Sequence, residues 1–396
     1  MKVNLPVIQT IEKPVSGEWG IEPSGGQIIK VLRNTNFNND GSLNLKDVVE
    51  REIVSAKISS KKLKYGDILI EKSGGSPNQP VGRVVFFDGT GEDYLFSNFT
   101  SALRPKKDIF PKYLFYLLYG NHLFKRTLSY QNKTTGILNL QLERYLKESI
   151  IPVPSFEDQQ RIATILDHAD SIRRKNRQIL EKYNELAQSV FYEMFGDPIK
   201  NTFNYQIITL KEACYSIKDG PHLSPKYVER GIPFISVNNI IKGFWDFSNL
   251  KFISQRDHEL FNKKCNPRKG DILYSKGGTT GFAKYIDIDL EFSNWVHLAV
   301  LKFDREKING RFLESMLNSP YCYSQSQLLT RGIANRDLVL GQMAKIKLLS
   351  PPIELQKKFS DINENIENQK VYVKQCLQKS EDLFQSLLQR AFRGEL

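Results

Sequence analysis

Two stretches of the chain space their apolar residues as an α-helix does when it packs along a narrow seam. In residues 156–197 the seam positions recur at alternating intervals of three and four residues, which is the heptad repeat of a coiled coil. Between the apolar positions stand Ala169, Asn176 and Tyr183. The apolar members of this first seam are Ile162, Ile165, Ile172, Ile179, Leu186 and Val190. The pattern predicts one long helix over residues 156–197.

The same pattern returns 197 residues later, in residues 353–396. The apolar members of this second seam are Phe359, Ile362, Ile366, Val373, Leu383 and Leu387. Gln369 and Ser380 interrupt it, and polar seam residues cost stability but can fix the register. The alternative to pairing is that each helix packs on its own domain alone. Because neither is hydrophobic all round and both seams resemble coiled coils, we favour pairing of the two helices as an antiparallel coiled coil.

The two helices close two copies of a larger repeat. "KYGDILIEKSGG" (64–75) returns as "RKGDILYSKGGT" (268–279), and "KTTGILNLQL" (133–142) returns as "LTRGIANRDL" (329–338), with offsets between 196 and 204 residues. Each copy mixes short helical patterns with strand-like runs that enter glycine turns. The sequence therefore predicts an α+β protein with a pseudo-twofold internal repeat. Its expected parts are a globular domain in residues 1–155, a long helix in 156–197, a second globular domain in 198–352 and a second long helix in 353–396.

Charge separates the globular parts from the helices. Residues 1–156 carry 21 basic and 15 acidic side chains and residues 196–353 carry 22 and 15, whereas the two helical stretches together are close to neutral. Basic surface on two domains favours a polyanionic partner, with double-stranded DNA first, although a basic but inert surface is the alternative. No stretch approaches the ~20 apolar residues that span a bilayer. The four cysteines are scattered, so we expect a cytoplasmic protein without disulfides and without a membrane partner.

No catalytic constellation stands out in the sequence. "KGGTTGFAK" (276–284) is glycine-rich but lacks the spacing of a phosphate-binding loop, and the five histidines are isolated from other metal ligands. Carboxylates at the two helix starts suit the first turn of a helix, where the macrodipole favours them. We expect a chain that is not an enzyme and holds no metal. A nuclease with an unrecognised site and a coiled-coil scaffold with DNA-binding domains remain the alternatives.

Polar and basic loops at matching places in the two copies are the candidate DNA contacts. Arg, Lys, Asn and Gln can engage base edges, while hydroxyl groups and glycine amides suit phosphates. In the first copy the candidates are Lys72, Ser73, Asn78, Gln79, Arg83, Asn132, Lys133 and Thr134. In the second copy they are Lys218, His222, Lys226, Lys276, Thr279, Thr280, Lys284, Arg331, Asn335 and Arg336.

With repeat, charge and helices in view, the chain resembles the specificity subunit of type I restriction-modification enzymes over nearly its whole length. The resemblance rests on "RNTNFNNDGSL" (33–43), "KDGPHLSPKYVERGIPFISVNNI" (218–240), the two "GDIL" runs, "TTGILNLQL" and the helix entries "PVPSFEDQQRIATIL" and "SPPIELQKKFSDI". The first copy departs from the second in one place, since "SGEWGIEPSGG" (16–26) stands where the second has "KDGPHLSPKY".

The resemblance implies a function that the residues alone do not give. Each globular domain would be a target recognition domain for one half of a bipartite, asymmetric DNA sequence. The paired helices would set the spacing and dock two modification subunits, which bind S-adenosylmethionine and methylate adenine at N6. Where restriction subunits join, two of them would use ATP with magnesium to translocate and cleave DNA. This chain would hold no cofactor itself.

Overall fold

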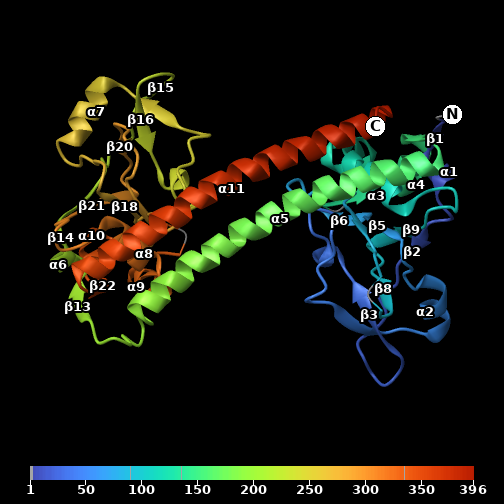
Figure 1. Cartoon of the computed structure of the whole chain (residues 1–396), viewed down its shortest axis with the longest axis horizontal. Coiled ribbons are helices and arrows are strands. Elements are labelled where there is room, and N and C mark those ends of the chain that lie inside the picture. The colour runs from blue at the N-terminus through green and yellow to red at the C-terminus, as the bar shows by residue number, and fades with distance from the viewer. Residues whose placement is uncertain (1–2, 90, 135, 334) are drawn as a thin grey trace. The chain divides into compact units, whose positions relative to one another are not determined.

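The computed structural model describes residues 3–89, 91–134, 136–333 and 335–396, with only the backbone described at Thr134. The chain forms two compact units, the first made of Met1–Gln178 with Lys374–Leu396 and the second of Ile179–Val373. The two long helices are α5 (Phe156–Phe195) and α11 (Ile353–Arg393), drawn in green and red in Figure 1. Each unit therefore contains one globular domain and a part of both helices.

Two sheets shape the globular domain of the first unit. An antiparallel sheet has the order β2 (Val15–Ser16), β9 (Thr100–Leu103), β5 (Ile68–Glu71) and β7 (Val84–Phe86). A second sheet has the order β4 (Val49–Glu52), β3 (Ile28–Leu32) and β8 (Tyr94–Phe96), with β3 and β8 parallel. Smaller pairings join β6 (Ser73–Gly75) to the hairpin of β10 (Gln131–Thr134) and β11 (Ile137–Leu140), and β1 (Val3–Pro6) to β12 (Ile150–Val153).

The second unit repeats this topology. Its first sheet has the order β14 (Cys214–Asp219), β21 (Leu298–Phe303), β18 (Ile272–Ser275) and β19 (Ala283–Tyr285). Its second sheet adds β15 (Tyr227–Val228) outside β17 (Lys251–Ile253), β16 (Ile232–Ile235) and β20 (Ser293–Asn294), and β16 and β20 are again parallel. β13 (Gln206–Thr209) pairs with β22 (Lys347–Ser350) as β1 does with β12. The predicted α+β class and internal repeat are confirmed.

Short helices complete both units. In the first they are α1 (Val7–Thr10), α2 (Ser55–Lys61), α3 (Pro111–Leu123), α4 (Leu142–Glu148) and the 3₁₀ turns η1 (Asn34–Asn36) and η2 (Arg126–Tyr130). In the second they are α6 (Leu210–Ala213), α7 (Gln255–Asn262), α8 (Gly310–Asn318), α9 (Pro320–Leu329), α10 (Leu340–Met343) and η3 (Val237–Asn239).

A buried glutamine stands at the same place in the first turn of each long helix, and it accounts for the similarity of the two helix entries. Gln159 Oε1 accepts from the backbone N–H of Phe110 at 2.8 Å, and its amide nitrogen donates to carbonyls of the same unit. Gln356 Oε1 accepts from the N–H of Asn309 at 2.9 Å in the second unit. Each glutamine thereby ties the first turn of a long helix to the loop before α3 or α8. Both side chains are buried, so these bonds satisfy backbone groups that water does not reach.

The long helices belong to the cores of both units. In the first, Ile162 and Leu166 of α5 share a hydrophobic cluster with Phe384 and Leu388 of α11. In the second, Phe195 near the end of α5 packs on Phe359 near the start of α11, with ring centroids 5.3 Å apart. The start of one helix thus meets the end of the other within each unit, as antiparallel pairing requires.

The predicted seam is correct at one of its two heptad positions and wrong at the other. Ile162, Ile366 and Val373 are buried as predicted, but Ile172, Ile179 and Leu186 are 49%, 42% and 46% exposed. Along α5 the partner helix is instead met by side chains one residue later, such as Leu166 and Arg173.

The second helix shows the same one-residue error. Leu383 is 49% exposed, whereas Phe384 is fully buried, and Asn363 rather than Ile362 is a buried position. Ile165, Ile362 and Leu387 are partly buried beside the seam, and Phe359 and Val190 lie in or against the second core. At these positions each helix therefore contacts its partner through the residue that follows the predicted seam residue.

Candidate nucleic-acid interface

Each globular domain has a polar cleft at the same place in its fold. In the first domain a cleft of about 480 Å³ lies between η1 with its following loop and the glycine turn after β5. In the second domain a cleft of about 610 Å³ lies between η3 and the turn Gly277–Thr279 after β18. The elements on both sides of each cleft correspond in the repeat, so the two clefts are structural counterparts.

One asparagine in each copy shapes the turn beside the cleft. Asn36 Oδ1 accepts from the N–H of Arg33 and Asn239 Oδ1 accepts from the N–H of Ser236, both at 2.8 Å. Their amide nitrogens donate to loop carbonyls, Asn36 to Asn44 at 2.9 Å and Asn239 to Asp246 at 2.8 Å. Both amides are buried, and an asparagine can satisfy this turn because it offers an acceptor and donors on one short side chain.

A buried ion pair forms the floor of the first cleft. Arg83 Nε and Nη2 donate to the two carboxylate oxygens of Glu71 at 2.9 and 3.0 Å, and Asn34 Nδ2 donates to Glu71 at 2.8 Å. Arg83 and Glu71 are 7% and 2% exposed. A paired, fork-like geometry offsets much of the cost of burying both charges. The pair thus fixes the glycine turn against η1.

The second cleft is built from different chemistry. The turn asparagines and the paired strands align the two copies, and this alignment places Val237, Ser275 and Phe282 where the first domain has Asn34, Glu71 and Arg83. The second cleft is lined by aromatic rings instead: Trp295 stacks on His297 with centroids 5.1 Å apart. A flat aromatic surface can take a base by stacking, whereas the first cleft offers mainly amides and charge.

Most candidate residues of the first domain lie on or beside its cleft. Gln79 lines the cleft and Asn78 is exposed in the same turn. Lys72 donates to Ser16 at 2.6 Å and Ser73 donates to Asn139 at 2.6 Å, at the base of that turn. Asn132 and Lys133 are exposed on β10, in the sheet that contains β6. The side chain of Thr134 lies outside the described part of the structure.

In the second domain the structure brings two candidate loops together. Thr279 lines the cleft, and the N–H of Gly278 donates to the carbonyl of Arg336 at 3.0 Å. Arg331, Asn335 and Arg336 are exposed in the second of these loops. A third candidate segment with Lys218, His222 and Lys226 is exposed along the end of β14 and the loop after it.

Four candidates are not surface contacts, and the prediction for them is corrected. Arg83 pairs with Glu71, Lys276 with Asp337 at 2.9 Å, and Lys284 with Glu314 at 3.2 Å. Thr280 is 1% exposed and its hydroxyl lies 3.0 Å from that of Thr330. Each is buried because a partner far away in the sequence neutralises or satisfies it. These side chains hold the cleft loops in place.

Several cleft residues were not identified from the sequence. In the first domain these are Asn34, Asn38 and Asn39, and in the second Tyr227 and Lys251, whose ammonium lies 4.3 Å from the Tyr227 ring centroid. The available signal was the asparagine shared by "RNTN" and "SVNN", which marks the same turn in both copies. Charge and glycine content pointed only to the opposite wall of each cleft.

A buried histidine in the second domain has the neighbours of a hydrolase triad but not its access. His258 Nδ1 lies 2.9 Å from Ser293 Oγ, and its Nε2 lies 3.2 Å from Glu291 Oε1. Ser293 is 1% exposed and belongs to β20, so its hydroxyl does not face solvent. The arrangement holds α7 against the strand. Among the described residues no group of His, Cys, Asp and Glu has the geometry of a metal site.

Among the described residues, no helix is both long enough and apolar enough to cross a membrane.

The two clefts lie in two parts of the chain that match the same protein-family model. The family model for the type I restriction modification DNA specificity domain matches the chain twice, over residues 24–185 and 202–379. The chain belongs to this family. Each specificity-domain match contains one cleft and runs on into one long helix, so the family unit coincides with the repeat.

Individual members of the specificity family are distant but extensive matches. The specificity subunit of the type I restriction enzyme EcoKI of Escherichia coli K12 is 22% identical over 93% of this chain and 82% of its own length. The MjaVIII specificity subunit of Methanocaldococcus jannaschii is 24% identical over 64% of this chain, and the match spans 63% of that subunit. The crystal structure of the S subunit of a type I system from M. genitalium shares the fold, with a TM-score of 0.60, 16% identity and coverage of 99% and 96%.

Proposed function

We propose that this chain is the DNA sequence-recognition subunit of a type I restriction-modification complex, in which each cleft reads one half of a bipartite target. Membership of the DNA specificity family supports the recognition role. The single observation that carries the finer proposal is the pair of counterpart clefts with different linings. Equivalent positions with unlike chemistry suit two half-sites of unlike sequence, because base edges are read by local hydrogen-bonding and stacking groups.

The paired helices supply the geometry in this proposal. They are shared between both units and are the natural candidates for setting the gap between half-sites and for docking two modification subunits. Those partners would bind S-adenosylmethionine and methylate adenine, and restriction subunits, where present, would use ATP and magnesium. Excess positive charge on the two globular parts would add a salt-dependent contribution from phosphate contacts.

Long-read sequencing of N6-methyladenine in host DNA, with and without this gene, tests the proposal. We expect deletion to remove one bipartite, asymmetric methylated motif, and re-expression of the chain to restore it. Replacing residues 76–80 at the mouth of the first cleft should then alter one half of the motif and leave the other half and the gap unchanged. This replacement also assigns a half-site to the first domain.

An unchanged methylation pattern in the deletion strain would contradict the proposal, provided that the chain is expressed. A nuclease is the alternative function, although Ser293, the hydroxyl beside His258, is buried away from solvent. Cleavage of DNA by the purified chain without partner subunits would nevertheless establish it.

A further inference from the structure

The loop that lines the first cleft is anchored from behind by the first long helix. Phe37, Asn38 and Asn39 line the cleft, and the chain then reverses at Asp40–Gly41. Phe37 pairs with Leu43 across the base of this hairpin. The reversal needs glycine, because Gly41 has φ +82° and a Cβ there would lie 2.7 Å from the Phe115 ring. The tip of the loop is therefore pressed against α3.

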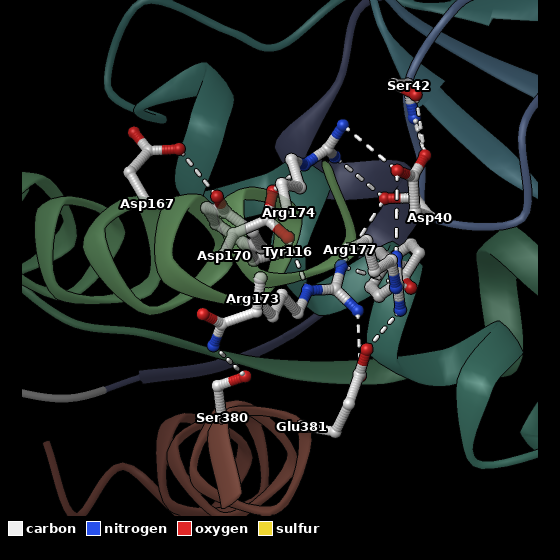
Figure 2. Close-up of polar contacts among 12 residues, drawn as sticks. Asp40, Ser42, Tyr116, Asp167, Asp170, Arg173, Arg174, Arg177, Ser380 and Glu381 are labelled. Atoms are coloured by element: carbon white, nitrogen blue, oxygen red, sulfur yellow. Dashed lines mark hydrogen bonds and ion pairs between the residues drawn. The ribbon is translucent and has the colours of Figure 1, made fainter. Parts of the chain in front are cut away.

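Three arginines of α5 converge on Asp40 at this tip. Arg174 Nη1 lies 3.2 Å from the carboxylate of Asp40, and its Nη2 donates to the Asp40 carbonyl at 2.9 Å. Arg177 Nη1 lies 3.8 Å from the carboxylate, and Arg173 Nη2 lies 3.5 Å from the carbonyl oxygen. Ser42 completes the site by donating its N–H and hydroxyl to the other carboxylate oxygen at 3.0 and 2.6 Å. Figure 2 shows these side chains pointing towards one another.

Two of these arginines also contact the second long helix. Arg173 pairs with Glu381 of α11 at 3.3 Å, and Arg177 pairs with the same carboxylate. Asp170 takes the remaining nitrogens of Arg173 and Arg174. Three cations thus face three carboxylates, and Arg173, whose side chain is 3% exposed, lies over the Phe384 ring at 4.0 Å. Cleft loop, α5 and α11 share one ionic network inside the first unit (Figure 2).

The network keeps Asp40 charged at neutral pH. Burial by itself would raise the pKa of Asp40, but the hydrogen bonds from Ser42 and the charge of Arg174 outweigh it and hold the pKa below its ordinary value of 3.8. A lowered folded-state pKa stabilises the fold above the unfolded value, and this stabilisation is lost only as the pH falls through the lower folded value. Asp40 is therefore the charged partner of these arginines at neutral pH.

Among the described residues, the positions of the second unit that correspond to Asp40, Arg173 and Arg174 form no such anchor. Adding 197 to Arg173 and Arg174 leads to Lys370, which pairs with Glu367 at 2.6 Å, and to Val371, which is 53% exposed. Counting from the shared turn asparagine, Gly243 stands in the place of Asp40. The contact thus distinguishes the two recognition domains.

We propose that Asp40 is a positioning residue for base recognition in the first domain: with Arg174 and Arg177 it fixes the cleft loop to the helix pair. The inference rests on the proposed function. If the anchor is released, Asn38 and Asn39 lose their fixed place relative to the rest of the cleft. Discrimination among bases should then weaken in one half-site, since each mismatched base pair is rejected by only about 1–3 kcal/mol.

The test uses the full chain with its partner subunits in cells and compares D40A, R174A and the double variant by long-read methylation sequencing. We expect methylation of cognate sites to persist, while discrimination against single mismatches in the first-domain half-site falls about tenfold, that is about 1.4 kcal/mol. The double variant should relax no further than either single one, because both remove the same contact. D40N retains the shape of the side chain and serves if D40A fails to accumulate.

K370A, at the corresponding place in the second unit, is the matched control and should leave the first-domain half-site unchanged. Undiminished discrimination in D40A and R174A, or equal relaxation of both half-sites, would overturn the inference while leaving the proposed function intact. A wild-type strain without any bipartite motif would instead overturn the proposed function, and this inference with it.

Discussion

Single residues at matching positions give the two clefts their different characters. In the first domain Glu71 and Arg83 form a buried ion pair under the cleft, where the second domain has Ser275 and Phe282. A buried pair adds little net stability compared with apolar residues, but the loss of one partner leaves the other charge without compensation. The pair therefore makes the first cleft sensitive to single substitutions.

Replacing Arg83 by Met should destabilise the first unit by about 3–5 kcal/mol, because Glu71 would remain buried as an unpaired carboxylate. The double variant E71M/R83M should recover most of that loss. Urea unfolding of the purified chain measures both. If R83M lowers the free energy of unfolding by less than about 1 kcal/mol, the ion pair does not hold the cleft floor.

Residue identity alone could not separate surface contacts from buried ones. Arg83, Lys276 and Lys284 were candidate DNA contacts because basic side chains in polar loops can engage base edges. Their partners Glu71, Asp337 and Glu314 lie 12 to 61 positions away in the sequence, and only the fold brings them close. The structure places these loops at the clefts, whereas the direction of these side chains was not available from the sequence.

At the scale of elements, the long helices were predictable and their contact face was not. Apolar residues occupy adjacent positions in several turns, as in Ile165–Leu166, Ile179–Leu180 and Leu383–Phe384. A heptad pattern fits either member of such a pair equally well. Tertiary contacts determine which member is buried. Leu166 and Phe384, the second members of their pairs, are buried in the core of the first unit.

Two neighbouring alanine variants in α11 test this assignment. F384A removes a fully buried ring and should lower the free energy of unfolding by about 3–5 kcal/mol. L383A, one position earlier and 49% exposed, is the matched control and should cost less than about 1 kcal/mol. Thermal or urea unfolding of the two variants provides the comparison. A larger loss for L383A would restore the seam predicted from the heptad pattern.

At the scale of the whole molecule, duplication places one recognition domain and parts of both helices in each unit. Fold class and repeat were predictable because they depend on patterns that recur along the chain. The clefts were not, because their walls come from segments separated by about forty residues in each copy, such as η1 and the turn after β5.

Lengthening both helices by seven residues tests their role in spacing. Insertion after Gln178 in α5 and after Val373 in α11 preserves the heptad phase and lies at the boundary between the two units. Seven helical residues add about 10 Å, so the gap between half-sites should grow by about three base pairs. Methylation sequencing would read the gap directly.

Insertion into α5 alone is the control and should abolish methylation, because it shifts one seam against the other. An unchanged gap in the chain with both insertions would contradict the spacing role of the helices.

The offset of 197 residues between the two seams has a consequence for shorter chains. Phe359 stands in α11 where Ile162 stands in α5, so each helix carries the same kind of contact face and the other helix is its partner. A polypeptide that ended after α5 would present that face without a partner, and a second copy of itself could cover it about a true twofold axis. Such a homodimer would carry two identical clefts and would read a palindrome. In the present chain the two halves are covalently joined and unequal, so under the proposed function its target need not be symmetric.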